Sequence, residues 1–201
     1  MNDLMAMCVL GRPGSGKDIQ AELLADTFNL APIKTSALLT KKFATETGNP
    51  VVQQQKELYD AGDLVDPPFI VSLIKEHIRG LFNRNLDSQN GIIFGGSPRT
   101  LYESEQLIPF FVECFGEDRV FGIYIDVAEE ECIERIIKRN ARELDRDKNV
   151  LKVRMQEFEE RTMPAIEYFR EHGTVIEVDG MQDIQTVFSS IQSALQPYNI
   201  Q

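Results

Sequence analysis

The stretch 11-GRPGSGK-17 decides how this 201-residue chain folds. The apolar run 5–10 precedes it and stops at Gly11, as a strand buried in a parallel sheet would. After Lys17, apolar residues recur at helical spacing. A glycine-rich turn between such a strand and a helix aims several backbone N–H groups at one point, and the lysine adds a positive charge. The stretch therefore predicts a loop that binds the phosphates of a nucleotide.

Strand and helix patterns alternate along the rest of the chain. Further buried strands are predicted at 91–96, 121–127 and 174–178, and helical patterns follow them. This alternation predicts an α/β fold, a three-layer sandwich with a parallel five-stranded sheet of the P-loop nucleoside triphosphate hydrolase type. Ligands of such sheets bind at the carboxyl ends of the strands, which is where the loop 11–17 and the segment 95–99 fall.

The composition limits the partners of the chain. A formal net charge of -11 argues against binding to nucleic acid or to an anionic membrane, because both require a basic surface. No apolar run is long enough to span a bilayer, and the amino terminus lacks a secretion signal. The cysteines Cys8, Cys114 and Cys132 have neither paired nor metal-type spacing, which favours reduced thiols. We therefore expect one domain, 1–201, that works in the cytoplasm as a monomer.

Several stretches, in the same order along the chain, resemble motifs of adenylate kinase and its nucleoside monophosphate kinase relatives. They are 11-GRPGSGK-17, 61-AGDLV-65, 94-FGGSPRT-100, 134-ERIIKRN-140, 161-RTMPAIEYFREHG-173 and 178-VDG-180. The resemblance implies direct transfer of the γ-phosphoryl group of ATP to a nucleoside monophosphate, most simply AMP, with Mg²⁺ and without a covalent intermediate. It also implies an acceptor-binding insertion at about 34–66 and a short lid at about 140–150.

The resemblance assigns five residues to catalysis. Lys17 would bind the β and γ phosphates of ATP, and Arg99 would bind the acceptor phosphate. Arg139 would reach the transferred phosphoryl group, while Arg142 and Arg154 would close over it from the lid. Phosphoryl transfer requires alignment of the reactants and neutralisation of charge on the oxygens, so a ring of cations suits the reaction.

The resemblance also implies two sets of nucleotide contacts. Arg135 would lie against the adenine of ATP, and Thr35 would line the acceptor pocket. The ATP set is Gly11, Pro13, Gly14, Ser15, Gly16, Lys17, Asp18, Ile19, Arg135 and Arg139. The acceptor set is Thr40, Asp63, Leu64, Val65, Gly96, Arg99 and Glu103, together with Thr35. No side chain is assigned as a direct metal ligand.

Four positions depart from the family pattern. Ile19 stands where the family has a threonine, and Gly95 stands where it has an aspartate that orients magnesium-bound water. Thr40 replaces an arginine for the acceptor phosphate, and Glu103 replaces a glutamine that reads the adenine amino group. Together these changes remove a hydroxyl and a carboxylate from the metal side, and an arginine and an amide from the acceptor side.

These departures leave alternatives open. Asp18 could replace the missing carboxylate, directly or through water, or could lie in solvent and only favour the helix start. Lys41 or Lys42 could partly replace the missing arginine, although a lysine lacks its bidentate fork. The chain could be an adenylate kinase with an attenuated rate, a nucleotide-binding module without catalysis, or a kinase for another acceptor whose base suits Glu103.

Overall fold

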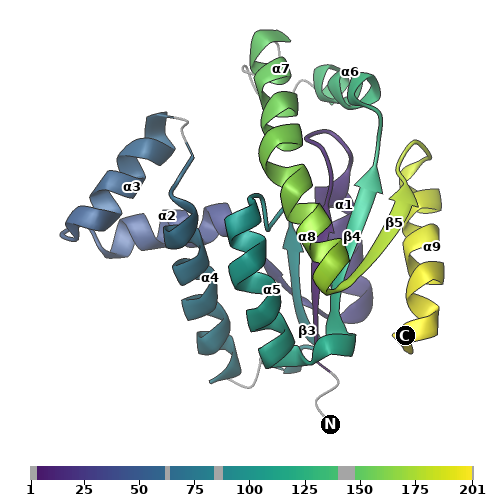
Figure 1. The fold of residues 1–201 in the computed structure, drawn as a ribbon, viewed down its shortest axis with the longest axis horizontal. Coiled ribbons are helices and arrows are strands. Elements are labelled where there is room, and N and C mark those ends of the chain that lie inside the picture. The colour runs from purple at the N-terminus through teal and green to yellow at the C-terminus, as the bar shows by residue number, and fades with distance from the viewer. Residues whose placement is uncertain (1–3, 62–63, 84–87, 140–147, 201) are drawn as a thin grey trace.

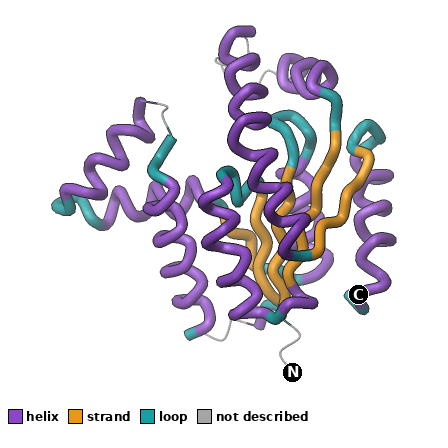
Figure 2. Tube along the Cα trace, viewed as in Figure 1, coloured by secondary structure: helices purple, strands orange, loops and turns teal. Residues whose placement is uncertain are grey.

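A parallel sheet forms the centre of the protein (Figures 1 and 2). The computed structural model describes residues 4–61, 64–83, 88–139 and 148–200. In these residues the sheet has five strands in the order β2-β3-β1-β4-β5, and all neighbouring strands are parallel. The strands are β1 (Met5–Leu10), β2 (Ala31–Ile33), β3 (Gly91–Gly95), β4 (Val120–Asp126) and β5 (Thr174–Asp179). The predicted α/β class and parallel five-stranded sheet are confirmed.

Helices cover both faces of the sheet and extend beyond its carboxyl end (Figure 1). One face carries α4 (Pro67–Phe82), α5 (Leu101–Phe115) and α8 (Met163–His172). The other carries α1 (Lys17–Phe28) and α9 (Ile184–Leu195). Above the strand ends in Figure 1 lie α6 (Glu129–Arg139) and α7 (Lys148–Glu157). Short 3₁₀ turns, Glu117–Arg119 and Gln196–Tyr198, follow α5 and α9.

The central strand shows why the sheet needs a helix layer on each face. Every residue of β1 is buried. Successive side chains of a strand point to opposite faces, so β1 contributes alternately to two cores. Ala6, Cys8 and Leu10 pack on the side of α4 and α5. Met5, Met7 and Val9 pack on the side of α1 and α9.

A long helical segment runs from α7 through a π-helical turn, Phe158–Thr162, into α8. Pro164 lies in the first turn of α8. Proline has no N–H to donate and its ring clashes with the carbonyl four residues earlier, so the helix widens at this point. The turn places Glu159 and Thr162 close to the carboxyl edge of the sheet, where both make contacts described below.

Two helices, α2 (Thr35–Thr45) and α3 (Pro50–Ala61), stand to the side of the sheet (Figure 1). They pack against each other, with the rings of Phe43 and Tyr59 5.6 Å apart. The buried Gln55 of α3 donates to Asp66 at 2.6 Å and so fixes the approach to α4. These helices lie within the stretch 34–66, whose role as an acceptor-binding insertion stays a prediction. None of the described helices combines the length and apolarity needed to cross a membrane.

Candidate active site at the carboxyl end of the sheet

The glycine-rich loop between β1 and α1 is tightly packed. Gly14 has a φ of 91°, and a Cβ there would lie 2.5 Å from the carbonyl oxygen of Cys132 in α6. Gly16, also at φ 91°, caps the amino terminus of α1. Only glycine adopts this left-handed backbone readily. Inside the loop, the hydroxyl of Ser15 is buried and has no hydrogen-bond partner among the described residues. The loop thus presents a helix amino terminus and an unsatisfied hydroxyl, which suits an anion.

Lys17 and Arg99 meet over Gly96, just beyond the end of β3. A Cβ on Gly96 would lie 2.9 Å from Cε of Lys17 and 3.6 Å from Nη2 of Arg99. Gly96 donates its N–H to the carbonyl of Val9 at 2.9 Å, which fixes this segment to β1. Nε of Arg99 donates to the carbonyl of Gly96 at 2.7 Å. Two residues far apart in sequence are therefore held side by side at one edge of the sheet.

The ammonium group of Lys17 lies in a cationic environment. Burial lowers its pKa, and the positive charges of Arg99 and of Arg154 on α7 lower it further, against the opposite effects of Asp18 and Cys132. Each of these cations makes the charged form of the others less favourable, and a bound anion would offset this effect. Of the residues that the resemblance assigned to catalysis, Lys17 and Arg99 thus meet at Gly96, and Arg154 is near enough to lower the pKa of Lys17.

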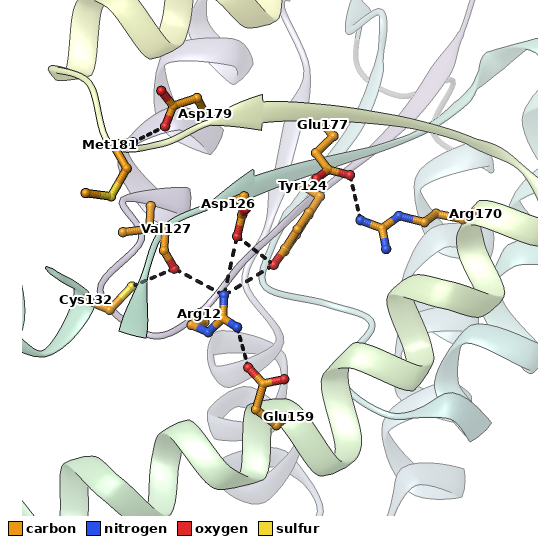
Figure 3. A network of polar contacts seen from close by, with 10 residues as sticks. All are labelled: Arg12, Tyr124, Asp126, Val127, Cys132, Glu159, Arg170, Glu177, Asp179 and Met181. Atoms are coloured by element: carbon orange, nitrogen blue, oxygen red, sulfur yellow. Dashed lines mark hydrogen bonds and ion pairs between the residues drawn. The ribbon is translucent and has the colours of Figure 1, made fainter. Parts of the chain in front are cut away.

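Arg12 connects this loop to distant parts of the chain (Figure 3). Its Nη1 donates to the carbonyl of Val127 at 3.2 Å and to the hydroxyl of Tyr124 at 3.4 Å. The same atom lies 3.5 Å from Oδ1 of Asp126, and Nη2 pairs with Glu159 of the π-helical turn. The sequence suggested no role for Arg12, because its partners become visible only once β4 and the π-helical turn are folded against the loop.

The partners of Arg12 are themselves connected. The hydroxyl of Tyr124 donates to Oδ1 of Asp126 at 3.2 Å (Figure 3). Burial, together with the negative charge of Asp126, raises the pKa of Tyr124 to about 12. The phenol therefore remains protonated at neutral pH and keeps donating to the carboxylate. This arrangement holds the end of β4 and the base of the glycine-rich loop in one position.

On the acceptor side, the start of α2 is joined to the loop after β3. The hydroxyl oxygens of Thr35 and Ser97 lie 2.9 Å apart as hydrogen-bond partners. Thr162 of the π-helical turn donates to the carbonyl of Arg99 at 3.1 Å. Val65 is buried and Leu64 is exposed. The structure thus brings the predicted acceptor residue Thr35 to the edge where Arg99 lies. Asp63 lies outside the described residues.

Sequence comparison with known proteins identifies the family of this chain. The model of the adenylate kinase family matches residues 9–174. The chain belongs to the adenylate kinase family. It is 30% identical over 194 residues to an adenylate kinase of Trichodesmium erythraeum, covering 94% of this chain and 96% of that protein. It is 32% identical over 194 residues to an adenylate kinase of Xanthomonas campestris, covering 95% and 99%. The predicted family, P-loop fold and adenylate kinase type of phosphotransferase activity are thereby confirmed.

One of the four departures from the adenylate kinase pattern, Thr40, lies on α2, as does Lys42, a suggested substitute for the missing arginine. Thr40 is exposed, and its hydroxyl donates to the carbonyl of Ser36 in the same helix at 2.9 Å. Nζ of Lys42 lies 2.6 Å from a carboxylate oxygen of Glu46 and 3.1 Å from one of Glu76. The charge of Lys42 is therefore already neutralised by two carboxylates, which weakens its case as a substitute for the missing arginine.

Glu103, where the adenylate kinase pattern has a glutamine, is 5% exposed, and one of its carboxylate oxygens already accepts a hydrogen bond. Its Oε2 accepts from the backbone N–H of Arg99 at 2.9 Å, and its own N–H donates to the hydroxyl of Thr100 at 3.2 Å. This is a variant of the capping box that begins many helices. Burial raises the pKa of Glu103, against the lowering effect of its bond to Arg99. The residue therefore has a structural task at the start of α5.

The remaining predicted ATP contacts differ in exposure. Ile19 is 44% exposed on α1. Nε of Arg135 donates to Glu131 in the same helix at 2.7 Å. Arg139 is exposed at the carboxyl end of α6. Arg142 lies outside the described residues, as does most of the predicted lid, 140–150.

The site also contains oxygen groups suited to a Mg²⁺ ion that arrives with ATP. Mg²⁺ prefers hard oxygen ligands and usually keeps several waters. The hydroxyl of Ser15, which has no hydrogen-bond partner in the described part of the chain, lies in the loop next to Lys17. The carboxylate of Asp18 lies beside Gly95, with Oδ1 3.2 Å from the position that a Cβ of residue 95 would take. The residues present therefore fit a metal–nucleotide complex.

Proposed function

We propose that this chain transfers the γ-phosphoryl group of ATP to AMP, with Lys17, Arg99 and Arg154 as the cations that align and neutralise the phosphates. One observation carries the proposal: Lys17 and Arg99 meet over Gly96, in surroundings that lower the pKa of Lys17. A lysine held among other cations, in surroundings that disfavour its charge, is costly unless an anion binds there. The triphosphate of ATP and the phosphate of AMP supply that negative charge.

ATP is proposed to bind along the glycine-rich loop. The backbone N–H groups of 11–17 and the amino terminus of α1 would bind the β and γ phosphates, and Lys17 would pair with their oxygens. Arg135 would lie against the adenine, and Arg139 and Arg142 would join Arg154 around the transferred group. Mg²⁺ bound with ATP would neutralise part of the phosphate charge. Arg12 would not touch the nucleotide but would hold the loop in position through Val127 and Glu159.

The acceptor is proposed to enter from the side of α2 and α3. Arg99 would bind its phosphate, because the bond from Nε to the carbonyl of Gly96 orients the guanidinium while the side chain stays exposed. Thr35, joined to Ser97, would line the pocket. The insertion 34–66 and the lid 140–150 would close over the two nucleotides and exclude water, which prevents hydrolysis of ATP.

The proposal extends to the oligomeric state, the compartment and the partners of the protein. All three cations of the proposed site come from one chain, so a monomer is sufficient. Cys8, Cys114 and Cys132 are free thiols, which suits the cytoplasm. The net charge of -11 suits small-molecule partners better than nucleic acid or membrane lipids.

A coupled assay of ADP formation from ATP and AMP tests the proposal. Wild type should form ADP, and Lys17→Ala should lower the rate about 10³-fold, because a fixed charge on the transferring group is lost. Lys56→Ala is the matched control, since Lys56 is exposed and pairs with Asp60 within α3. An equal rate in Lys17→Ala and Lys56→Ala would contradict the proposed site. ATP binding by calorimetry without any turnover would instead indicate a nucleotide-binding module.

Glu103 favours a second candidate acceptor. An ionised carboxylate only accepts hydrogen bonds, whereas the ring nitrogen beside the adenine amino group also accepts and therefore needs a donor. A buried carboxylate at this position suits a base whose edge carries donors only. The same assay with AMP, dAMP, CMP, UMP and GMP as acceptors distinguishes the candidates, since the preferred acceptor is the one with the highest kcat/KM.

A further inference from the structure

We infer that Asp18, in the first turn of α1, supplies the carboxylate that orients the metal–nucleotide complex at the end of β3, and that Gly95 is small because it makes room for this carboxylate. The inference rests on the proposed function. It assigns a positioning role to one residue and explains a second residue, Gly95, that otherwise counts only as a loss.

The first observation is the space beside Gly95. A Cβ on Gly95 would lie 3.2 Å from Oδ1 of Asp18, 3.6 Å from Cβ of Ala21 and 4.0 Å from Cα of Asp18. A carboxylate oxygen of α1 thus lies next to the point where a side chain of residue 95 would begin. A longer side chain at 95 would compete with Asp18 for the same room. Side chains at positions 18 and 95 therefore share one space.

The second observation is the charge around Asp18. Its carboxylate raises the pKa of Lys17, whereas burial and the two arginines lower it. The carboxylate is therefore close enough to the ammonium group to affect its protonation. Asp18 lies beside Gly95, and Lys17 and Arg99 meet at the next residue, Gly96. A carboxylate at this point can accept hydrogen bonds from water molecules on a Mg²⁺ ion that is bound to the phosphates.

Asp18 is also compatible with its position in the helix. It is exposed and lies in the first turn of α1, where the positive end of the helix stabilises a negative side chain. A carboxylate that only stabilised the helix start would satisfy this observation as well. The two roles differ in one respect: only a metal-orienting carboxylate makes the strengthening of ATP binding by Mg²⁺ depend on the charge of residue 18.

Calorimetry of ATP binding, in Mg²⁺ and in EDTA, separates the two roles. In wild type Mg²⁺ should strengthen ATP binding. Asp18→Asn keeps the shape of the side chain but removes its charge, and it should reduce this strengthening about tenfold, as the loss of other outer-sphere partners of a metal does. Affinity in EDTA should not fall, because a negative charge near the phosphates is lost. Asp26→Asn is the matched control, since Asp26 is exposed on the same helix.

Moving the carboxylate from position 18 to position 95 tests whether the two positions share one space. Gly95→Asp alone should lower both the melting temperature and the Mg²⁺ effect, because two carboxylates would crowd one space. The double variant Asp18→Gly with Gly95→Asp should recover the Mg²⁺ effect to within about threefold of wild type. Such non-additivity is the signature of two residues in contact.

Each outcome supports or overturns the inference. A Mg²⁺ effect in Asp18→Asn equal to that in Asp26→Asn overturns the role of Asp18 and leaves the proposed kinase function standing. A double variant no better than Gly95→Asp overturns the link between the two positions. Wild type that binds no ATP under either condition overturns the proposed function and this inference with it.

Discussion

The two halves of the proposed site are held in different ways. On the ATP side, the loop 11–17 is tied to β4 and to the π-helical turn through Arg12 and is packed against α6 at Gly14. On the acceptor side, α2 and α3 stand away from the sheet, and α2 is tied to the site by the contact between Thr35 and Ser97. The ATP side is thus tied directly to the sheet, whereas the acceptor side packs into the core from beside it, through Leu39, Phe43 and Val52.

The difference explains where departures from the family pattern matter. A cation on the ATP side, such as Lys17, lies against the buried Gly96 and beside Arg99. On α2, Thr40 is exposed and bonded to its own helix, and Lys42 is neutralised by Glu46 and Glu76. Loss of an arginine there is not visibly compensated by these residues. We therefore expect the chain to bind ATP well and its acceptor less tightly.

The largest effect is expected from Arg99, which belongs to both halves. Arg99→Ala should lower kcat/KM for AMP about 10³-fold, because a charge that stabilises the transferring group is removed. Arg99→Lys keeps the charge but not the planar fork, and it should recover part of the loss. Steady-state assays with AMP varied and ATP saturating measure both variants. If ATP binding by calorimetry fell as much as kcat/KM, Arg99 would belong to the ATP side alone.

Arg12 should matter for ATP alone. Arg12→Met keeps the length of the side chain but leaves Asp126 and Glu159 without their partner, and it should weaken ATP binding about tenfold by loosening the loop. Stability should fall by about 1 to 2 kcal/mol, measured by urea unfolding. Lys56→Met is the control, because Lys56 is exposed and pairs with Asp60 within α3, outside the network of Arg12. Equal loss of ATP affinity in both variants would contradict the positioning role of Arg12.

The acceptor side should be open to improvement. Thr40→Arg introduces a guanidinium at the position of the family arginine, and it should lower KM for AMP about fivefold through a charge-assisted hydrogen bond. Thr45→Arg is the control, since Thr45 is exposed on the same helix and likewise bonded to its backbone. An equal change of KM in the two variants would mean that a general increase in positive charge, and not position 40, is responsible.

The smallest effect is a dependence of stability on pH at Glu103. Burial raises its pKa above the ordinary value of 4.5, so the folded state binds a proton more readily than the unfolded state. The resulting stability is fully present below pH 4.5 and is lost as the pH rises through the folded pKa. The free energy of unfolding of Glu103→Gln, relative to that of wild type, should therefore be about 1 kcal/mol higher at pH 7 than at pH 4. Urea unfolding at both pH values measures the difference; an unchanged difference would contradict the raised pKa.

Much of the fold was predictable from local patterns. The strand β1, the glycine-rich loop and the helix after it follow from the spacing of apolar residues and glycines in 5–28. The short β2 was not located, because three residues show no periodicity of their own. Ile19, a predicted ATP contact, is exposed in the first turn of α1.

The contacts of the site were predictable only in part. That Lys17 and Arg99 would gather at one edge follows from parallel strands whose carboxyl ends meet there. The partner of Arg12 is Glu159, 147 residues away, and no local pattern connects them. The capping bond of Glu103 and the pairing of Lys42 with Glu76 equally required the folded chain.

The sequence alone determined that this chain builds a parallel α/β sheet with a phosphate-binding loop, because glycine positions and apolar periods act within a few residues of each other. Tertiary structure alone decided which charges are neutralised and which remain for a ligand. Charges interact through space over several ångströms regardless of their separation along the chain. For that reason Asp18 beside Gly95, and Arg12 beside Glu159, became visible only after the chain was folded.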